Sequence, residues 1–402
     1  MEFTHQDDPS RTGKLVMAKD DPPTWVAQYE DASGKGRRKS FKQPAGRLTV
    51  ADARGFAHLK AYQKALAHLI NKERFVVRAP QAGPVRWMGR ITAKYRGAAS
   101  YCRLAGDKLL VVGTDLTHAH TLDANGSGSR TFELPDAPGN VTSARVAPVG
   151  DDALLLVHRS LGRDDGGRRV AAHVYRASLA PTGLDFTALL RLEGAHEKMA
   201  NALASSAADI FITSHPEGVG LFESNGTTLA SWLGRSAAIS RSGEFIAVAT
   251  PDAIDVYRSP NWETPQFTVE KASPDSFCMM DSGELTWSGT VTEEYGTFAA
   301  AMGGQATRLG RLGRPVLDGR TFLAANGVAM CLSTLDDDGI RTTRQFVLPA
   351  GLGCAKTASL TFIDASTALF GSDAYTFGAL AIAELESFDH SPLFHPVFPD
   401  VG

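Results

Sequence analysis

One short pattern recurs through most of the chain and constrains its fold more than any other feature. A polar turn with glycine or aspartate precedes a run of mostly apolar residues, many of them β-branched or aromatic. The pattern occurs seven times, at intervals of roughly 35 to 57 residues, with apolar runs at 109–112, 153–157, 210–213, 245–248, 285–287, 321–323 and 367–370. Such a period is typical of units built from four short strands.

The residues between these runs fit four strands per unit. In the fourth unit, segments rich in β-forming residues occupy 236–240, 244–249, 253–257 and 266–270, each bounded by turn residues. We therefore predict an all-β fold: a seven-bladed β-propeller at 85–388 with a small N-terminal β-sheet-plus-helix domain. Segment 85–92 is predicted to complete the last blade, because closure of the ring removes an open sheet edge. Segment 394–398 is the competing candidate.

This pattern resembles the WD-repeat propellers in architecture over about 300 residues. The resemblance does not extend to the motif, since the chain has no Trp-Asp or Gly-His dipeptides. It implies a platform for protein interactions, because most such propellers serve that purpose and a minority are enzymes. Fold alone does not decide between these functions.

The N-terminal region has a different pattern. Residues 1–13 are polar and are predicted to be disordered, and 14–80 are predicted to form a small basic β/α module. Strands are expected at 14–18, 25–29 and 37–41. Thr49 followed by Asp52 resembles a helix N-cap, and an apolar stripe with helical spacing follows it at Phe56, Leu59, Tyr62, Leu66 and Leu69. Residues 389–402 are predicted to be an extended tail.

Charge divides the chain at about residue 98. Residues 1–98 contain 19 Lys and Arg against 9 Asp and Glu, whereas the remainder contains 22 against 35. A basic module on an acidic body is typical of attachment to nucleic acid or to an acidic partner. Attraction between the two parts of the same chain is the alternative explanation. The residues predicted to contact nucleic acid are Trp25, Lys35, Arg37, Arg38, Lys39 and Lys42.

Two families resemble this module over about 60 residues. Strands 25–29 and 37–41 with the helix resemble the arm-type DNA-binding domain of phage-type integrases. That resemblance implies Arg37, Arg38 and Lys39 as contacts in a DNA major groove. The segments 39–41 and 72–77 with the helix are also similar to a WGR domain, a module of nucleic-acid-associated proteins, although the Trp-Gly-Arg signature is missing at the expected place.

No catalytic or cofactor motif is recognisable. The chain lacks the glycine-rich phosphate-binding motifs. His118 and His120 share one face of a predicted strand, but no third ligand is near them in sequence. The four cysteines are far apart and are predicted to be free thiols. We expect no cofactor and no metal, and we predict that the chain is not an enzyme.

Partner binding is predicted at two further places. The second unit is the longest repeat, and its predicted loops carry Arg163, Arg168 and Arg169. The tail carries Phe394 and Phe398 among prolines. The start is too polar for a secretory signal, so we expect a cytoplasmic protein. The Ala/Gly/Arg-rich composition suggests a bacterial source.

These observations favour a non-catalytic scaffold. Its propeller would bind a protein partner, and its basic module would bind nucleic acid or an acidic partner. Two alternatives remain open. One is a subunit of a bacterial defence or regulatory complex that makes only protein contacts, and the other is a propeller enzyme with its site at the channel mouth.

Overall fold

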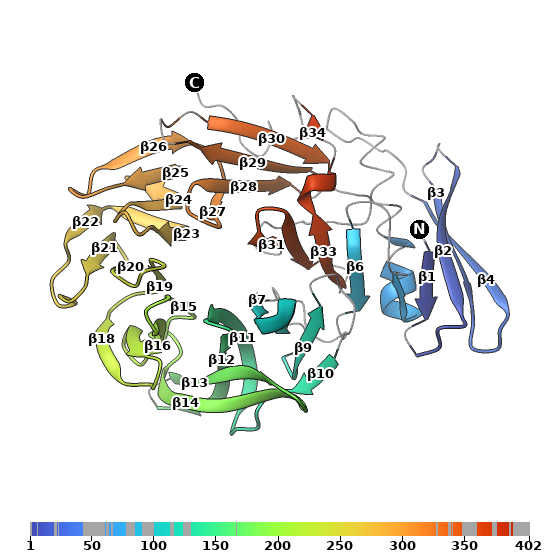
Figure 1. Cartoon of the computed structure of the whole chain (residues 1–402), viewed down its shortest axis with the longest axis horizontal. Coiled ribbons are helices and arrows are strands. Elements are labelled where there is room, and N and C mark those ends of the chain that lie inside the picture. The colour runs from blue at the N-terminus through green and yellow to red at the C-terminus, as the bar shows by residue number, and fades with distance from the viewer. Residues whose placement is uncertain are drawn as a thin grey trace.

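The computed structural model describes most of the chain between residues 2 and 388. The longer segments outside the described residues are 43–60, 78–84, 91–99, 124–129, 348–359 and 389–402. The shorter ones are 1, 6, 20–21, 23, 62–63, 66, 113–115, 166, 327–328, 337–338, 340, 372–375 and 386. The described residues form one N-terminal sheet and seven further antiparallel sheets, which are arranged in a ring (Figure 1).

The first three blades of the ring have four strands each. Blade 1 contains β7 (Ser100–Leu104), β8 (Lys108–Val112), β9 (His118–Asp123) and β10 (Arg130–Glu133), with a 3₁₀ turn, η2 (Ala105–Asp107), after β7. Blade 2 contains β11 (Asn140–Val149), β12 (Asp152–Asp164), β13 (Gly167–Ala180) and β14 (Gly183–Ala195). Blade 3 contains β15 (Leu203–Ser205), β16 (Ile210–His215), β17 (Gly218–Glu223) and β18 (Thr228–Trp232).

The other four blades complete the ring. Blade 4 contains β19 (Ser236–Ile239), β20 (Phe245–Ala249), β21 (Ala253–Arg258) and β22 (Phe267–Glu270). Blade 5 contains β23 (Ala272–Met279), β24 (Leu285–Val291), β25 (Glu294–Ala300) and β26 (Ala306–Gly310). Blade 6 contains β27 (Arg314–Val316), β28 (Thr321–Asn326), β29 (Ala329–Leu335), β30 (Arg341–Val347) and the short β34 (Ser387–Phe388). Blade 7 contains β31 (Leu360–Asp364), β32 (Thr367–Gly371), β33 (Thr376–Ala381) and β6 (Val85–Arg90), and the turn η4 (Ile382–Glu384) follows β33.

The repeated sequence pattern is the hairpin between the first and second strands of each blade. Gly243 and Gly283 adopt φ values of 77° and 83° in the turns that precede β20 and β24, a region that L-residues other than glycine enter at a cost. Each second strand then lies between two neighbouring blades. All five residues of β20 are buried, which explains why these strands appear in the sequence as continuous apolar runs rather than alternating ones.

The prediction for ring closure is confirmed. β6 pairs antiparallel with β33, from Thr376 opposite Arg90 to Leu380 opposite Val85. The first strand after the N-terminal module thus completes the last blade. The competing segment, 394–398, lies outside the described residues.

The N-terminal sheet has five strands in the order β4-β3-β2-β1-β5. They are β1 (Glu2–His5), β2 (Thr12–Lys19), β3 (Thr24–Glu30), β4 (Gly36–Lys42) and β5 (Phe75–Val77). The prediction that residues 1–13 are disordered is therefore wrong. β1 pairs with both β2 and β5, and Phe3 is fully buried. Burial of Phe3 offsets the conformational entropy that β1 loses when it becomes ordered, although the other residues of this strand are polar.

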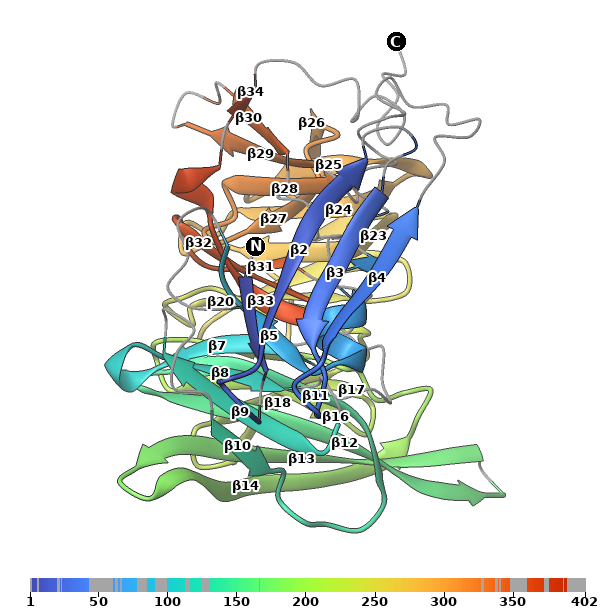
Figure 2. The ribbon, with the colours of Figure 1, turned by 90° about the vertical axis from the view of Figure 1, so that its right-hand side faces the viewer.

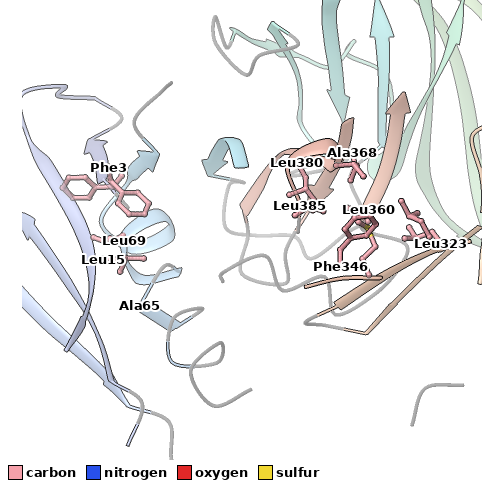
Figure 3. Packing of buried hydrophobic residues seen from close by; sticks show 14 of the residues in the cluster. Phe3, Leu15, Ala65, Leu69, Leu323, Phe346, Leu360, Ala368, Leu380 and Leu385 are labelled. Atoms are coloured by element: carbon pink, nitrogen blue, oxygen red, sulfur yellow. The ribbon is translucent and has the colours of Figure 1, made fainter. Parts of the chain in front are cut away.

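A short helical segment covers one face of this sheet. It includes the π-helical turn η1 (His68–Lys72), in which Leu69 is buried together with the preceding Ala65. The predicted cap at Thr49 and the stripe residues Phe56, Leu59, Tyr62 and Leu66 lie outside the described residues. One apolar cluster includes Phe3, Leu15 and Leu69 of the N-terminal module and also Leu360 and Leu380 of blade 7, and Figure 3 shows these side chains on the two sides of the junction.

Candidate functional site

The outer face of the N-terminal sheet carries a regular arrangement of cationic side chains. Strand register places Lys14, Gln28 and Arg38 in one row across β2, β3 and β4. Lys19, Thr24 and Lys42 form a second row, and Val16, Val26 and Ser40 lie between the two. All four cations, which are Lys14, Lys19, Arg38 and Lys42, are exposed. Figure 2 shows β2, β3 and β4 across the front of the molecule with the helix behind them.

Each row therefore has a cation on both outer strands and a polar side chain in the middle. Neighbouring strands are about 4.8 Å apart and residues on one face repeat about every 7 Å. The four cations thus mark the corners of a patch roughly 10 Å across the strands. Along its mid-line Gln28 is half-buried, whereas Thr24 and Val26 are buried. Because side chains alternate between faces, this patch is set by parity and register rather than by nearness in sequence.

The opposite face of the same strands is apolar. Leu15 and Ala27 are paired and pack in the cluster that contains Leu69 of η1. Trp25 and Phe41 are half-buried against this cluster. The predicted contact residue Trp25 is therefore placed on the helix side, away from the outer patch.

The predicted cations of β4 divide between the two faces. Arg38 and Lys42 lie on the outer face, whereas Arg37 and Lys39 alternate to the helix side, where Lys39 Nζ lies 5.8 Å from the centre of the Phe41 ring. Sequence reasoning grouped Arg37, Arg38 and Lys39 because they are consecutive, and it missed Lys14 and Lys19. For Lys14 the available signal was the alternation of β2, in which Leu15 is buried and its neighbours are exposed. Lys19 joins the row of Thr24 and Lys42 through the register shift between Met17 and Lys19, which leaves no local pattern.

One of the predicted cations is already neutralised within the chain. Arg37 Nε lies 2.6 Å from Asp31 Oδ2. Hydrogen bonds from Ser33, followed by the bond from Arg37, hold the pKa of Asp31 well below its usual value. The backbone N–H of Lys35 also donates to Asp31 Oδ1, at 3.1 Å. This turn fixes the geometry of the β3–β4 hairpin and leaves Arg37 with little charge for a ligand.

A polar cluster fixes the helix to the back of the sheet. His68 Nε2 lies 3.3 Å from the Tyr29 hydroxyl and 3.4 Å from Glu73 Oε1. Burial lowers the pKa of His68 and raises the pKa of Tyr29. These groups are enclosed between sheet and helix, so we assign them to positioning β3 against η1.

The second predicted site lies at the end of blade 2. Arg163, Arg168 and Arg169 were predicted to be in loops, but the structure places them in β12 and β13. With β14, these are the three longest strands of the described residues. Arg163 lies directly opposite Arg168, and Arg169 Nη1 is 3.8 Å from Asp164 Oδ2. Like charges directly opposite each other cost stability in a hairpin, and here the ladder continues through them.

The structure does not bring the two predicted sites together. The N-terminal sheet lies beside blade 7, and the arginines lie on blade 2, with blade 1 between them (Figure 1). Phe394 and Phe398 lie outside the described residues. Within the described ranges, no three His, Cys, Asp or Glu side chains gather as a metal site requires. No helix in the described part of the chain has the length and apolar character of a membrane span.

The chain is similar to known proteins in fold only. No known family model matches the chain, and no curated protein is similar to it in sequence. Among solved structures, the WD40 domain of SCAP from fission yeast aligns with 95% of this chain and 96% of its own, at 9% identity and a TM-score of 0.44. The virginiamycin B lyase from Staphylococcus aureus aligns with 73% and 98%, at 10% identity and a TM-score of 0.45. Its own ring of antiparallel sheets gives the chain the architecture of a WD-repeat-like β-propeller.

One prediction is corrected by these comparisons. The chain was predicted not to be an enzyme because no catalytic motif is recognisable. Solved propellers similar to it in fold include the virginiamycin B lyase and a puromycin hydrolase, the latter at 14% identity and a TM-score of 0.37. One fold can carry unrelated functions, because function depends on the site and not on the fold. The lack of a motif is therefore no ground for excluding an enzyme.

Proposed function

We propose that the chain is an interaction protein in which the outer face of the N-terminal sheet binds a nucleic-acid duplex, while the propeller contacts a protein partner. The observation that carries this proposal is the pair of rows that place Lys14 and Arg38, and Lys19 and Lys42, on either side of a polar mid-line. These exposed cations come from two separate strands and lie on one face of the sheet, on either side of the middle strand.

The dimensions of this face suit a DNA major groove. The groove is about 12 Å wide, and three strands span about 10 Å between their outer members. In that position the corner cations face the phosphates that border the groove, which supplies affinity without sequence preference. Gln28, on the middle strand, faces base edges, and a glutamine side chain pairs with adenine through two hydrogen bonds.

The charge balance supports the same orientation. The first 98 residues carry an excess of ten basic side chains, and the rest of the chain carries an excess of thirteen acidic ones. A polyanion is attracted to the N-terminal sheet and repelled by the body of the ring. The acidic propeller is therefore left free for a different class of partner.

Arg163 and Arg168 are the residues of the propeller that we propose for protein contact. Both lie near the end of the extended β12–β13 hairpin, and Arg163 is exposed. Among the described residues neither forms an ion pair, in contrast to Arg169. Two opposed arginines on one strand pair suit a carboxylate-bearing surface, because each guanidinium forms a bidentate contact.

A second candidate for the N-terminal module is an acidic protein segment. β4 is the edge strand of its sheet, and an extended peptide can add to such an edge through main-chain hydrogen bonds. Cations on both sides of β4 would favour an acidic segment. This candidate requires the β4 edge itself, whereas duplex binding requires the outer face.

Because side chains alternate between the two faces along β4, variants of the two faces distinguish duplex binding from binding of an acidic peptide. Binding of a fluorescein-labelled DNA duplex to the full chain is measured by anisotropy for two variants, each of which removes two formal positive charges. Lys14→Ala/Arg38→Ala removes two cations of the outer face, and Arg37→Ala/Lys39→Ala removes two from the helix side. We expect the first variant to weaken binding about tenfold or more at low salt and the second about twofold.

Equal losses in both variants would contradict the assignment to the outer face. Failure of the unaltered chain to bind any duplex at low salt would contradict nucleic-acid binding altogether. Binding of a polyglutamate peptide that is lost in the Arg37→Ala/Lys39→Ala variant would instead support the edge-strand candidate.

A further inference from the structure

The first strands of the blades form the wall of the central channel. β11 contacts the corresponding strand of each neighbouring blade, β7 and β15, and Figure 1 shows these strands around the middle of the ring. The described first strands β15, β19 and β27 have half-buried residues throughout. A side chain that remains accessible midway along such a strand, away from the turns at its ends, faces the channel.

Arg145 occupies such a position on β11. It lies opposite Leu156 of β12 and is exposed to solvent. Even so, burial by the surrounding protein lowers the pKa of Arg145. A side chain on the channel wall is accessible to solvent and at the same time has protein around it, as Arg145 does.

No carboxylate within the described residues pairs with Arg145. Desolvation is the one cause of its lowered pKa, and a nearby acidic group would oppose that shift. The arginine of the neighbouring first strand β7 is paired, unlike Arg145. Arg103 on that strand contacts Asp364 at 3.0 Å and Asp107 at 3.7 Å. Arginine is rarely enclosed by protein unless it is paired.

The groups beside Arg145 add no negative charge. Ser143 Oγ lies 3.2 Å from His158 Nδ1, and His158 Nε2 lies 2.8 Å from Ser214 Oγ, whose hydroxyl donates to the carbonyl of Ala200. Because the Ser214 proton is used for that carbonyl, Ser214 accepts from His158 Nε2–H, and Nδ1 accepts from Ser143. The imidazole is therefore held neutral between two hydroxyls, and Arg145 is left as the charged group of this part of the wall.

We propose that Arg145 anchors a binding site for a carboxylate group in the central channel, beside the Ser143–His158–Ser214 chain. A guanidinium presents two parallel donors that match the plane of a carboxylate. One positive charge balances a monoanion. A phosphate dianion would add net negative charge inside a ring in which acidic residues outnumber basic ones, so a carboxylate is favoured. It comes either from a small molecule or from an acidic side chain of a partner.

The test is an NMR titration of the full chain with isotope-labelled arginine and histidine. The probes are butyrate, inorganic phosphate, and a capped hexapeptide with one glutamate. We expect butyrate to shift the Arg145 Nε–H and His158 ring signals in a saturable manner, with phosphate weaker by about threefold or more. A peptide at least about tenfold tighter than butyrate would assign the carboxylate to a macromolecular partner, and equal affinities would assign it to a small molecule.

Two variants make the result specific. Arg145→Gln should abolish the saturable shift at His158, whereas Arg103→Gln, which removes an already paired arginine from the adjacent strand, should retain it. Far-UV circular dichroism and the melting temperature confirm that both variants fold. No saturable shift with any probe, an unchanged shift in Arg145→Gln, or tighter binding of phosphate than of butyrate would each overturn the proposal. None of these outcomes depends on nucleic-acid binding by the N-terminal sheet.

Discussion

At the scale of single residues, the buried His158 makes the stability of the fold depend on pH. Burial, followed by the charges of Arg145 and His196, lowers its pKa from 6.5 to about 4. The unfolded chain therefore takes up a proton on this side chain at a pH where the folded chain does not. Stability from the neutral imidazole is fully present above about pH 6.5 and is lost as the pH falls toward 4.

Replacement of His158 should therefore flatten the acid side of the stability curve. We expect the difference in unfolding free energy between pH 7 and pH 4.5 to be smaller in His158→Gln than in the unaltered chain by about 2–3 kcal/mol. Urea unfolding at several pH values measures this, with His118→Gln as a control on a half-buried histidine. Parallel curves for the unaltered and His158→Gln chains would contradict the assignment.

The sequence revealed site residues that lie in one run and missed those that are related only by pairing across strands. Arg38 and Lys42 were found because they are consecutive with other cations in a basic run. Lys14 and Lys19 were missed because their relation to Arg38 and Lys42 depends on the register of three strands. The Ser143–His158–Ser214 chain was missed for the same reason, since its members lie on two blades. Contacts between distant segments leave no local pattern.

At the scale of elements, β6 has the clearest role. It is the one strand of blade 7 that precedes the ring in sequence, and it pairs with β33 along most of its length. Without it, β33 would be an open edge, and the buried Ala379 and Leu380 would lose the strand beside them. Ring closure therefore depends on six residues near the N-terminal module.

Truncation on either side of β6 tests this dependence. A chain that begins at residue 83 keeps β6, and one that begins at residue 91 lacks it. Both lack the N-terminal sheet, so the first serves as the control for the second. We expect loss of β6 to destabilise the ring by about 3 kcal/mol or more, a fall in melting temperature of roughly 6–12 °C or more. Equal melting temperatures by calorimetry would show that β6 does not hold the ring closed.

The strands that could be predicted are those with a local signal. The second strand of each blade is buried on both faces and appears as an apolar run, so all seven were located from the sequence. β1 was missed because Phe3 is its single described core residue among polar neighbours. The length of β12 was also missed. Its end carries Ser160, Gly162 and Arg163 and continues through a register shift, and such residues are typical of a loop.

At the scale of the whole molecule, the charge division and the architecture agree. The basic N-terminal sheet lies on the outside of the ring beside blade 7 (Figure 1), and its cationic outer face is turned away from the helix that packs against the sheet. The cations of the acidic ring that we propose for ligand binding lie at two separate places. Arg145 is in the channel, and the Arg163–Arg168 pair is on blade 2. This separation predicts that ligands of the sheet and of the ring bind independently.

The most direct measurement is the salt dependence of duplex binding by the full chain. The logarithm of the affinity is followed against the logarithm of the salt concentration for the unaltered chain and for Lys14→Ala/Lys19→Ala/Arg38→Ala/Lys42→Ala. Four phosphate contacts on the outer face predict a slope of about −3 to −4, reduced to near zero or with no binding left in the variant. An unaltered chain that does not bind at low salt, or a variant that keeps the full slope, would contradict the central claim.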